Sequence, residues 1–150
     1  MNHGQDQKYV AVIPPAVIKD NASFTSIEVD TKGFNSLTVV CSLGATDIAM
    51  AALKLQSGDV SGTLTDVTGL NFSGGTDIAG NATSLPSATD DNELFVFQVD
   101  LRGKKRYWNI VATAGDGAAG TYLSAIAVLS RDAVNDGTVA GIANGSVIRG

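Results

Sequence analysis

The chain has 150 residues, of which 44% are hydrophobic, so it is long enough to bury the core of one domain, and its formal net charge is −5. Gly, Ala, Val, Thr, Ser and Asp are abundant, which favours an all-β fold. A single cysteine excludes an internal disulfide, and a single histidine argues against Ser-His-Asp, Cys-His and zinc chemistry. No apolar run reaches the length of a membrane span, and residues 1–10 lack a secretory signal, so we expect synthesis in a cytoplasm.

Two strands are predicted in the first thirty residues. The apolar run at 8–13 ends at Pro14 and Pro15, because proline cannot donate a hydrogen bond to a ladder. A second segment, at 23–30, ends at the turn 31–33.

The next two apolar segments differ in clarity. Residues 37–43 are nearly all apolar, which predicts a strand buried on both faces with Cys41 as a core side chain. Residues 47–56 are ambiguous, since Ala, Met and Leu favour helix while apolar and polar positions also alternate. A lone helix of this length is marginal in water, so we favour a strand.

The region 57–92 is polar and is dominated by Gly, Ser, Thr and Asp. It is too long for a bare connector in a compact domain. We expect a long exposed loop region that contains one or two short strands, at 64–67 and 70–73.

The strongest patterns follow that polar region. Apolar residues at every second position predict strands at 93–100, 106–113 and 121–130. The short link with Gly103 predicts a hairpin between the first two strands. The glycine-rich link 114–120 returns the chain to the third strand, so we expect an antiparallel meander.

The C-terminal residues 132–150 are too rich in Gly and Asn for a core strand, yet too apolar for a free tail. We expect an arm that packs on its own or a neighbouring subunit, and the candidate inter-subunit contacts are Val139, Ile142, Val147 and Ile148. The domain proper is residues 1–131. Seven to nine short strands predict an antiparallel two-sheet sandwich or jelly roll with extended N- and C-terminal arms.

Candidate sites for chemistry are few. The Gly-Asp-Gly stretch 115–117 is followed by neither a Walker lysine nor a helix, so we interpret it as a turn. Asp90, Asp91 and Glu93 offer oxygen ligands for Ca²⁺ without the spacing of an EF-hand, and acids before a strand more often discourage edge pairing. Nothing marks two of the fifteen acids as a glycosidase pair. We therefore predict no enzymatic activity, no metal and no cofactor.

Four cations lie within five residues: Arg102, Lys104, Lys105 and Arg106, followed by Tyr107 and Trp108. Three interpretations stay open for this basic segment. It is a solvated turn, or a basic patch that docks on an acidic patch of a partner or of an identical subunit, or a nucleic-acid site, which the net negative charge disfavours. The candidate partner-binding residues are the four cations and Trp108, although a lone aromatic side chain usually lies in a core.

Two segments resemble small structural proteins encoded in the virion-assembly regions of tailed bacteriophages. They are 29–47 (VDTKGFNSLTVVCSLGATD) and 99–131 (VDLRGKKRYWNIVATAGDGAAGTYLSAIAVLSR). The resemblance rests on an Asp-x-x-Gly-aromatic turn, a Leu-Gly-Ala-Thr-Asp link and an Asp-Leu-Arg-Gly segment followed by basic residues. It covers about a third of the chain.

The resemblance implies a capsid decoration or cement protein on the surface of a virion. Its expected partners are the major capsid protein and further copies of itself, commonly as a homotrimer, with no nucleic acid and no membrane. The alternative is a carbohydrate- or receptor-binding β-sandwich module of a tail or head fibre, in which Trp108, Tyr107 or Tyr122 stacks on the ligand. The exposure of these rings distinguishes the two.

Overall fold

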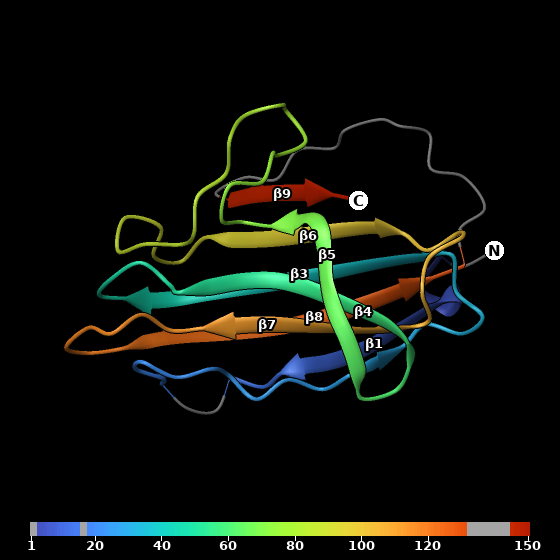
Figure 1. Cartoon of the computed structure of the whole chain (residues 1–150), viewed down its shortest axis with the longest axis horizontal. Coiled ribbons are helices and arrows are strands. Elements are labelled where there is room, and N and C mark those ends of the chain that lie inside the picture. Colours follow the sequence, from blue (N-terminus) through green and yellow to red (C-terminus); the bar gives the residue numbers. More distant parts are fainter. Residues whose placement is uncertain (1–2, 16–17, 132–144) are drawn as a thin grey trace.

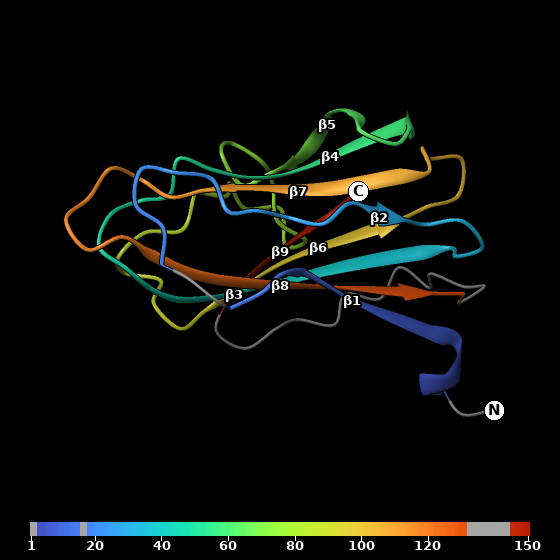
Figure 2. The ribbon, with the colours of Figure 1, turned by 90° about the horizontal axis from the view of Figure 1, so that it is seen from below.

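The computed structural model describes residues 3–15, 18–131 and 145–150, which form two β-sheets packed face to face (Figures 1 and 2). The predicted all-β sandwich is therefore confirmed. A short 3-10 helix, His3–Asp6, precedes the first strand, and no helix among the described residues could span a membrane.

The five-stranded sheet contains, in spatial order, β1 (Gln7–Ile13), β8 (Thr121–Ser130), β3 (Ser36–Thr46), β6 (Leu94–Asp100) and β9 (Gly145–Arg149). The four-stranded sheet contains β2 (Val29–Asp30), β7 (Tyr107–Thr113), β4 (Ala52–Val60) and β5 (Thr63–Asn71).

Alternating side chains explain why the clearest segments form strands. In β8 every second residue is buried, and the residues between them, such as Tyr122 and Ile126, face outward and are exposed. The same alternation buries Trp108, Ile110 and Ala112 in β7. β8 has its predicted bounds, and β6 and β7 each begin one residue later than predicted.

The predicted meander is wrong. β6 pairs with β3 and β9, whereas β7 lies in the opposite sheet and pairs with β2 and β4. The connections 101–106 and 114–120 therefore cross between the sheets instead of closing hairpins. This arrangement lets both strands bury their apolar faces in one core, where Trp108 and Phe97 belong to the same cluster.

Between the first strands, the structure corrects two details. The segment predicted at 23–30 pairs with β7 as a ladder only at β2, with an isolated bridge from Ser23 to Thr113. The central strand β3 is buried on one face rather than on both, because Leu37 and Cys41 point into the sandwich while Ser42 is exposed on the other side.

β4 and β5 form the one hairpin between consecutive strands in the described part of the chain. β4 confirms the strand interpretation of the ambiguous segment 47–56, although it starts at Ala52. The predicted short strands at 64–67 and 70–73 are replaced by the single strand β5. Its pairing with β4 is irregular, because the register shifts between Lys54 and Gln56 and again between Ser57 and Val60.

The C-terminal residues provide a further correction. The composition of 132–150 argued against a core strand, but 145–149 form β9, which runs parallel to β6 at the edge of the five-stranded sheet. Phe97 of β6 lies opposite Ile148, and both side chains are fully buried. Hydrophobic neighbours in the sheet therefore outweigh the weak strand propensity of the surrounding glycines and asparagines.

The core joins the two sheets through apolar side chains from nearly every strand. Phe72, which follows β5, meets Phe95 and Phe97 of β6 edge to face, with ring centroids 5.2 and 5.0 Å apart. Cys41 is fully buried, and burial raises the pKa of its thiol. Its predicted role as a core side chain is confirmed.

Candidate functional site

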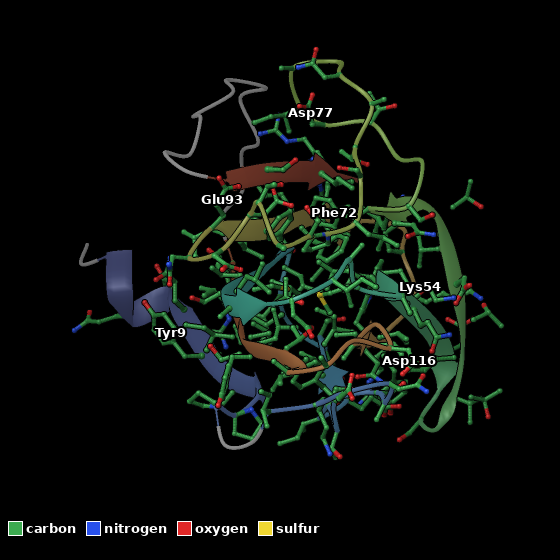
Figure 3. The ribbon with its side chains drawn as sticks, turned by 90° about the vertical axis from the view of Figure 1, so that its left-hand side faces the viewer. Tyr9, Lys54, Phe72, Asp77, Glu93 and Asp116 are labelled. Atoms are coloured by element: carbon green, nitrogen blue, oxygen red, sulfur yellow. The ribbon has the colours of Figure 1, made fainter. Side chains whose placement is uncertain are left out.

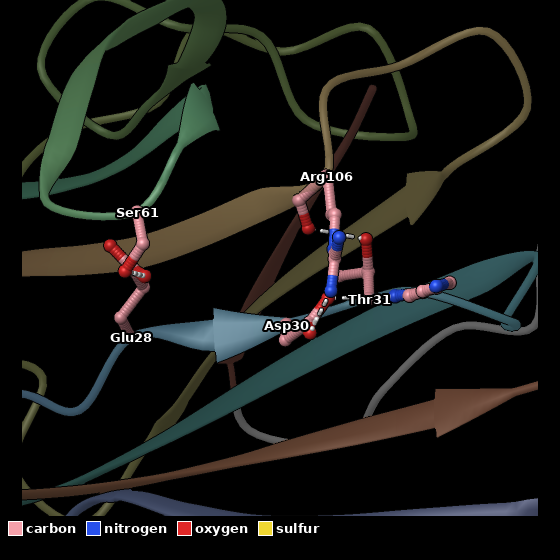
Figure 4. A network of polar contacts seen from close by, with 6 residues as sticks. Glu28, Asp30, Thr31, Ser61 and Arg106 are labelled. Carbon is pink, nitrogen blue, oxygen red and sulfur yellow. Dashed lines mark hydrogen bonds and ion pairs between the residues drawn. The ribbon is translucent and has the colours of Figure 1, made fainter.

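The basic segment forms the connection between β6 and β7 at one end of the sandwich. The Arg102 guanidinium turns back onto Asp100, with Nη2 2.5 Å from Oδ2 and Nε 2.9 Å from Oδ1. Arg106 reaches Asp30 through two parallel hydrogen bonds, Nε to Oδ1 at 2.8 Å and Nη2 to Oδ2 at 2.7 Å (Figure 4). The Thr31 hydroxyl also donates to the Arg106 carbonyl at 2.6 Å. Two of the four predicted cations thus fasten the loop to the fold.

These contacts lower the pKa of both carboxyl groups. The hydrogen bond from Arg106, followed by the backbone N–H of Lys32, holds the pKa of Asp30 well below its usual range. The hydrogen bonds from Arg102 lower the pKa of Asp100 to about 2. Because both ion pairs are open to solvent, they contribute little to stability and serve mainly to fix the loop geometry.

All four cations of this loop are exposed, and Lys104 and Lys105 differ from the two arginines in having no ion pair with a described residue. Both are exposed, and neither side chain forms a hydrogen bond or ion pair with another residue that the structure describes. Gly103 turns the chain between the arginine and the lysines with a φ of 72°. The loop therefore presents two unpaired ammonium groups on an anchored backbone.

Trp108 does not belong to this exposed surface, contrary to the tentative prediction. Its side chain is 2% exposed, and its indole Nε1–H donates to the Lys105 carbonyl at 2.8 Å. The inward position in β7 places the ring in the core, where no partner reaches it. The neighbouring Tyr107 is half-buried, with the Arg106 guanidinium 4.9 Å from its ring centroid.

The four predicted inter-subunit residues fall into two pairs. Val139 and Ile142 lie outside the described residues. Val147 and Ile148 are 2% and 0% exposed within the five-stranded sheet of their own chain. This burial argues against their role as contacts to a neighbouring subunit.

The acidic run before β6 holds loops in place. The Asp90 carboxylate accepts the Ser87 N–H at 2.7 Å, and that of Asp91 accepts the Thr46 N–H at 2.9 Å. No group of three or more His, Cys, Asp or Glu side chains among the described residues is arranged to hold a metal ion. The Ser-x-x-Asp spacing of Ser87 and Asp90 is a turn signal that indicates this local role.

The Gly-Asp-Gly loop binds carboxylates of its own chain. Asp47 accepts the N–H groups of Ala118 and Ala119 at 2.5 and 2.6 Å, and Asp20 accepts that of Gly117 at 3.0 Å. A Cβ atom at Gly117 would lie within 2.6 Å of the Asp47 carboxylate, so a glycine is required there. The prediction of a turn fits this geometry, in which the backbone N–H groups are already occupied.

Replacement of Asp47 by alanine is expected to loosen this loop. The backbone N–H of Ala119 contributes most to the lowered pKa of Asp47. Because the folded pKa lies below the ordinary value of 3.8, the contribution is complete above that value and is lost as the pH falls through the folded pKa. Hydrogen exchange should report lower protection factors at the Ala118 and Ala119 amides, both in the variant and in the wild type at low pH. If the variant at neutral pH has the same protection factors at these amides as wild type, this role of Asp47 is contradicted.

A second exposed feature lies on the outer face of the five-stranded sheet. Tyr122 is 53% exposed, and a surface pocket beside it is lined by Ser42, Gly44 and Ser124. The absence of a side chain at Gly44 leaves its backbone next to the Tyr122 Cβ. An aromatic ring with neighbouring hydroxyl groups is an arrangement that suits a sugar ring.

Comparisons with known proteins return no relative: no protein-family model matches this chain, and no curated protein or solved structure is significantly similar to it. Inference about function therefore depends on the exposed charges and rings. The structure brings Arg102, Lys104, Lys105 and Arg106 together on one loop and separates them from Trp108.

Proposed function

We propose that this chain is a non-enzymatic structural protein of a phage virion, a decoration or cement protein that binds the major capsid protein on the capsid surface. The observation that carries the proposal is the pair of unpaired, solvent-facing lysines, Lys104 and Lys105, on a loop that two ion pairs anchor. An anchored basic loop suits an acidic patch on a partner, because complementary charge steers the approach and fixes the register. The resemblance of segments 29–47 and 99–131 to phage structural proteins supports the same function.

The use of the acidic residues also favours a scaffold over an enzyme. Asp47, Asp90 and Asp91 each accept backbone N–H groups and thereby hold loops. Carboxylates that fix loops make a rigid surface, which is what a bridge between shell subunits requires. We further propose that copies cluster around a symmetry axis as a homotrimer, so that each protein contacts more than one shell subunit.

Co-sedimentation with purified empty capsids tests this function. The variant with Lys104→Ser and Lys105→Ser should bind the shells about tenfold more weakly, and its binding should depend less on salt. The control carries Lys54→Ser, which removes a positive charge outside the loop, at the ion pair with Asp66, and it should bind like wild type. Equal binding of both variants at low and high salt would leave the loop as a solvated turn.

A second candidate function rests on the exposed ring of Tyr122. As a carbohydrate- or receptor-binding module, the chain would stack a sugar on this ring and use the hydroxyl groups of Ser42 and Ser124. Glycan-array binding that is lost with Tyr122→Ala would favour this function. Binding to shells without any glycan signal would favour the cement protein.

A further inference from the structure

The strand pairings place the loops of this sandwich at two opposite ends of its long axis (Figure 1). Asp100 at the end of β6 and Ser130 at the end of β8 both lie opposite Ser36, the first residue of β3. The last residue of β3, Thr46, lies opposite Thr121 at the start of β8. Loops on either side of the strands therefore belong to clearly separate ends.

One end is basic. It contains eight of the ten Lys and Arg residues of the chain: Lys8, Lys32, Arg102, Lys104, Lys105, Arg106, Arg131 and Arg149. The described acids at the same end number five: Asp6, Glu28, Asp30, Asp59 and Asp100. We call this the basic end, and its described residues carry a net positive charge even though the whole chain carries −5.

The other end is acidic. It contains six acids against one cation, Lys19, and these acids are Asp20, Asp47, Asp90, Asp91, Glu93 and Asp116. Figure 3 looks onto this acidic end, where Glu93 and Asp116 are labelled. Asp91 contacts the end of β3, and Asp20 and Asp47 contact the loop that carries Asp116.

Both ends keep charges that no internal contact uses. Lys104 and Lys105 at the basic end form no side-chain hydrogen bond or ion pair with a described residue, and the same holds for the carboxylates of Glu93 and Asp116 at the acidic end. Among the acids that hold loops, Asp47 favours its charged form, since the backbone N–H groups of Ala119 and Ala118 lower the pKa of its carboxyl. The fold thus separates charge along its length instead of neutralising it.

We infer that the partner of the basic end is the acidic end of a second copy of this chain, in a head-to-tail contact. Charge complementarity selects this arrangement, because two basic ends or two acidic ends repel each other. Such a contact is heterologous, so it closes into a ring, such as a trimer, or continues as a chain of copies. This inference rests on the proposed function as an assembly protein and gives the basic loop a second partner. In a chain of copies the shell then meets the basic loop only at the end that no neighbouring copy covers.

Sedimentation velocity of the purified full chain tests the contact without any shell. At about 20 mM NaCl the weight-average sedimentation coefficient of wild type should rise with protein concentration, and at about 300 mM NaCl the rise should largely disappear. Two charge-reversed variants are then compared. The first carries Lys104→Glu and Lys105→Glu, and the second carries Glu93→Lys and Asp116→Lys. The first variant leaves six cations against seven described acids at the basic end, and the second leaves four acids against three cations at the acidic end. Each variant alone thus loses most of the charge difference between its ends, so its association should weaken at least about tenfold.

An equimolar mixture of the two reversed variants provides the decisive arm. The first variant keeps the unaltered acidic end and the second keeps the unaltered basic end, so the mixture should recover association at low salt as pairs that contain one copy of each. A control with Thr68→Glu adds negative charge to an exposed position of β5, away from the ends, and should associate like wild type.

Association that persists in both single variants, or a mixture that fails to recover it, would overturn the head-to-tail contact. A chain that is monomeric at every salt concentration would do the same. Those results leave shell binding to be decided by co-sedimentation, so failure of this contact and failure of the proposed function are separate outcomes.

Discussion

Replacement of Trp108 by alanine is expected to lower the free energy of unfolding by about 3–5 kcal/mol. The side chain is 2% exposed near the start of β7, and its removal leaves a cavity between the two sheets. The Lys105 carbonyl also loses the hydrogen bond that it accepts from the indole N–H, which ties the core to the basic loop. Urea unfolding followed by circular dichroism measures the loss.

Trp108→Phe is the matched control, because it keeps a buried ring and removes the N–H. It should cost clearly less than the alanine variant, since most of the apolar contact remains. If Trp108 served a ligand on the surface instead, both substitutions would leave the unfolding free energy near that of wild type. That result would contradict the core position of the ring.

Ile148→Ala is expected to lower the free energy of unfolding by about 2–5 kcal/mol. Ile148 is fully buried in β9, opposite Phe97 of β6, within a single chain. The loss should therefore be independent of protein concentration. Ser146→Ala, at a half-buried position of the same strand, is the control and should change stability little. A loss that appears only at concentrations where copies associate would instead assign this strand to a neighbouring subunit.

The strands of this fold could largely be predicted from the sequence, whereas their partners could not. The alternation in 107–113 and 121–130 reports one buried face per strand, and 94–100 follows the same pattern except that Val96 is buried on the other face. A strand can bury its apolar face equally well after a hairpin within one sheet or after a connection that crosses to the opposite sheet. The six residues 101–106 permit both, and the choice depends on contacts with β2, β3 and β4, far away in sequence.

Predictions of secondary structure from composition failed where pairing with a distant strand determines the structure. The glycines and asparagines of 132–150 argued against a core strand, yet Val147 and Ile148 complete the edge beside β6. The polar composition of 57–92 predicted only short strands, at 64–67 and 70–73, within a long exposed loop, but 63–71 form one strand that pairs with β4. In both cases a neighbouring strand supplies the hydrogen bonds that local propensity does not indicate.

The sequence shows the candidate site as a cluster of four cations. It does not show which of these cations form ion pairs and which do not. Spacing alone does not reveal that Arg102 and Arg106 are held by Asp100 and Asp30 while the two lysines stay unpaired. Asp30 is 76 residues from Arg106 in the chain. The separation of charge between the two ends likewise appears only once the strand directions are known.

The most direct measurement of the proposed cement function is the temperature at which purified capsid shells come apart, with and without saturating amounts of this protein. A ligand that binds the intact lattice and not its dissociated subunits must stabilise the lattice. The account predicts that saturated shells dissociate at a higher temperature than bare shells, and that Lys104→Ser with Lys105→Ser reduces the gain. Shells that are saturated with the bound protein and yet dissociate at the temperature of bare shells would contradict it.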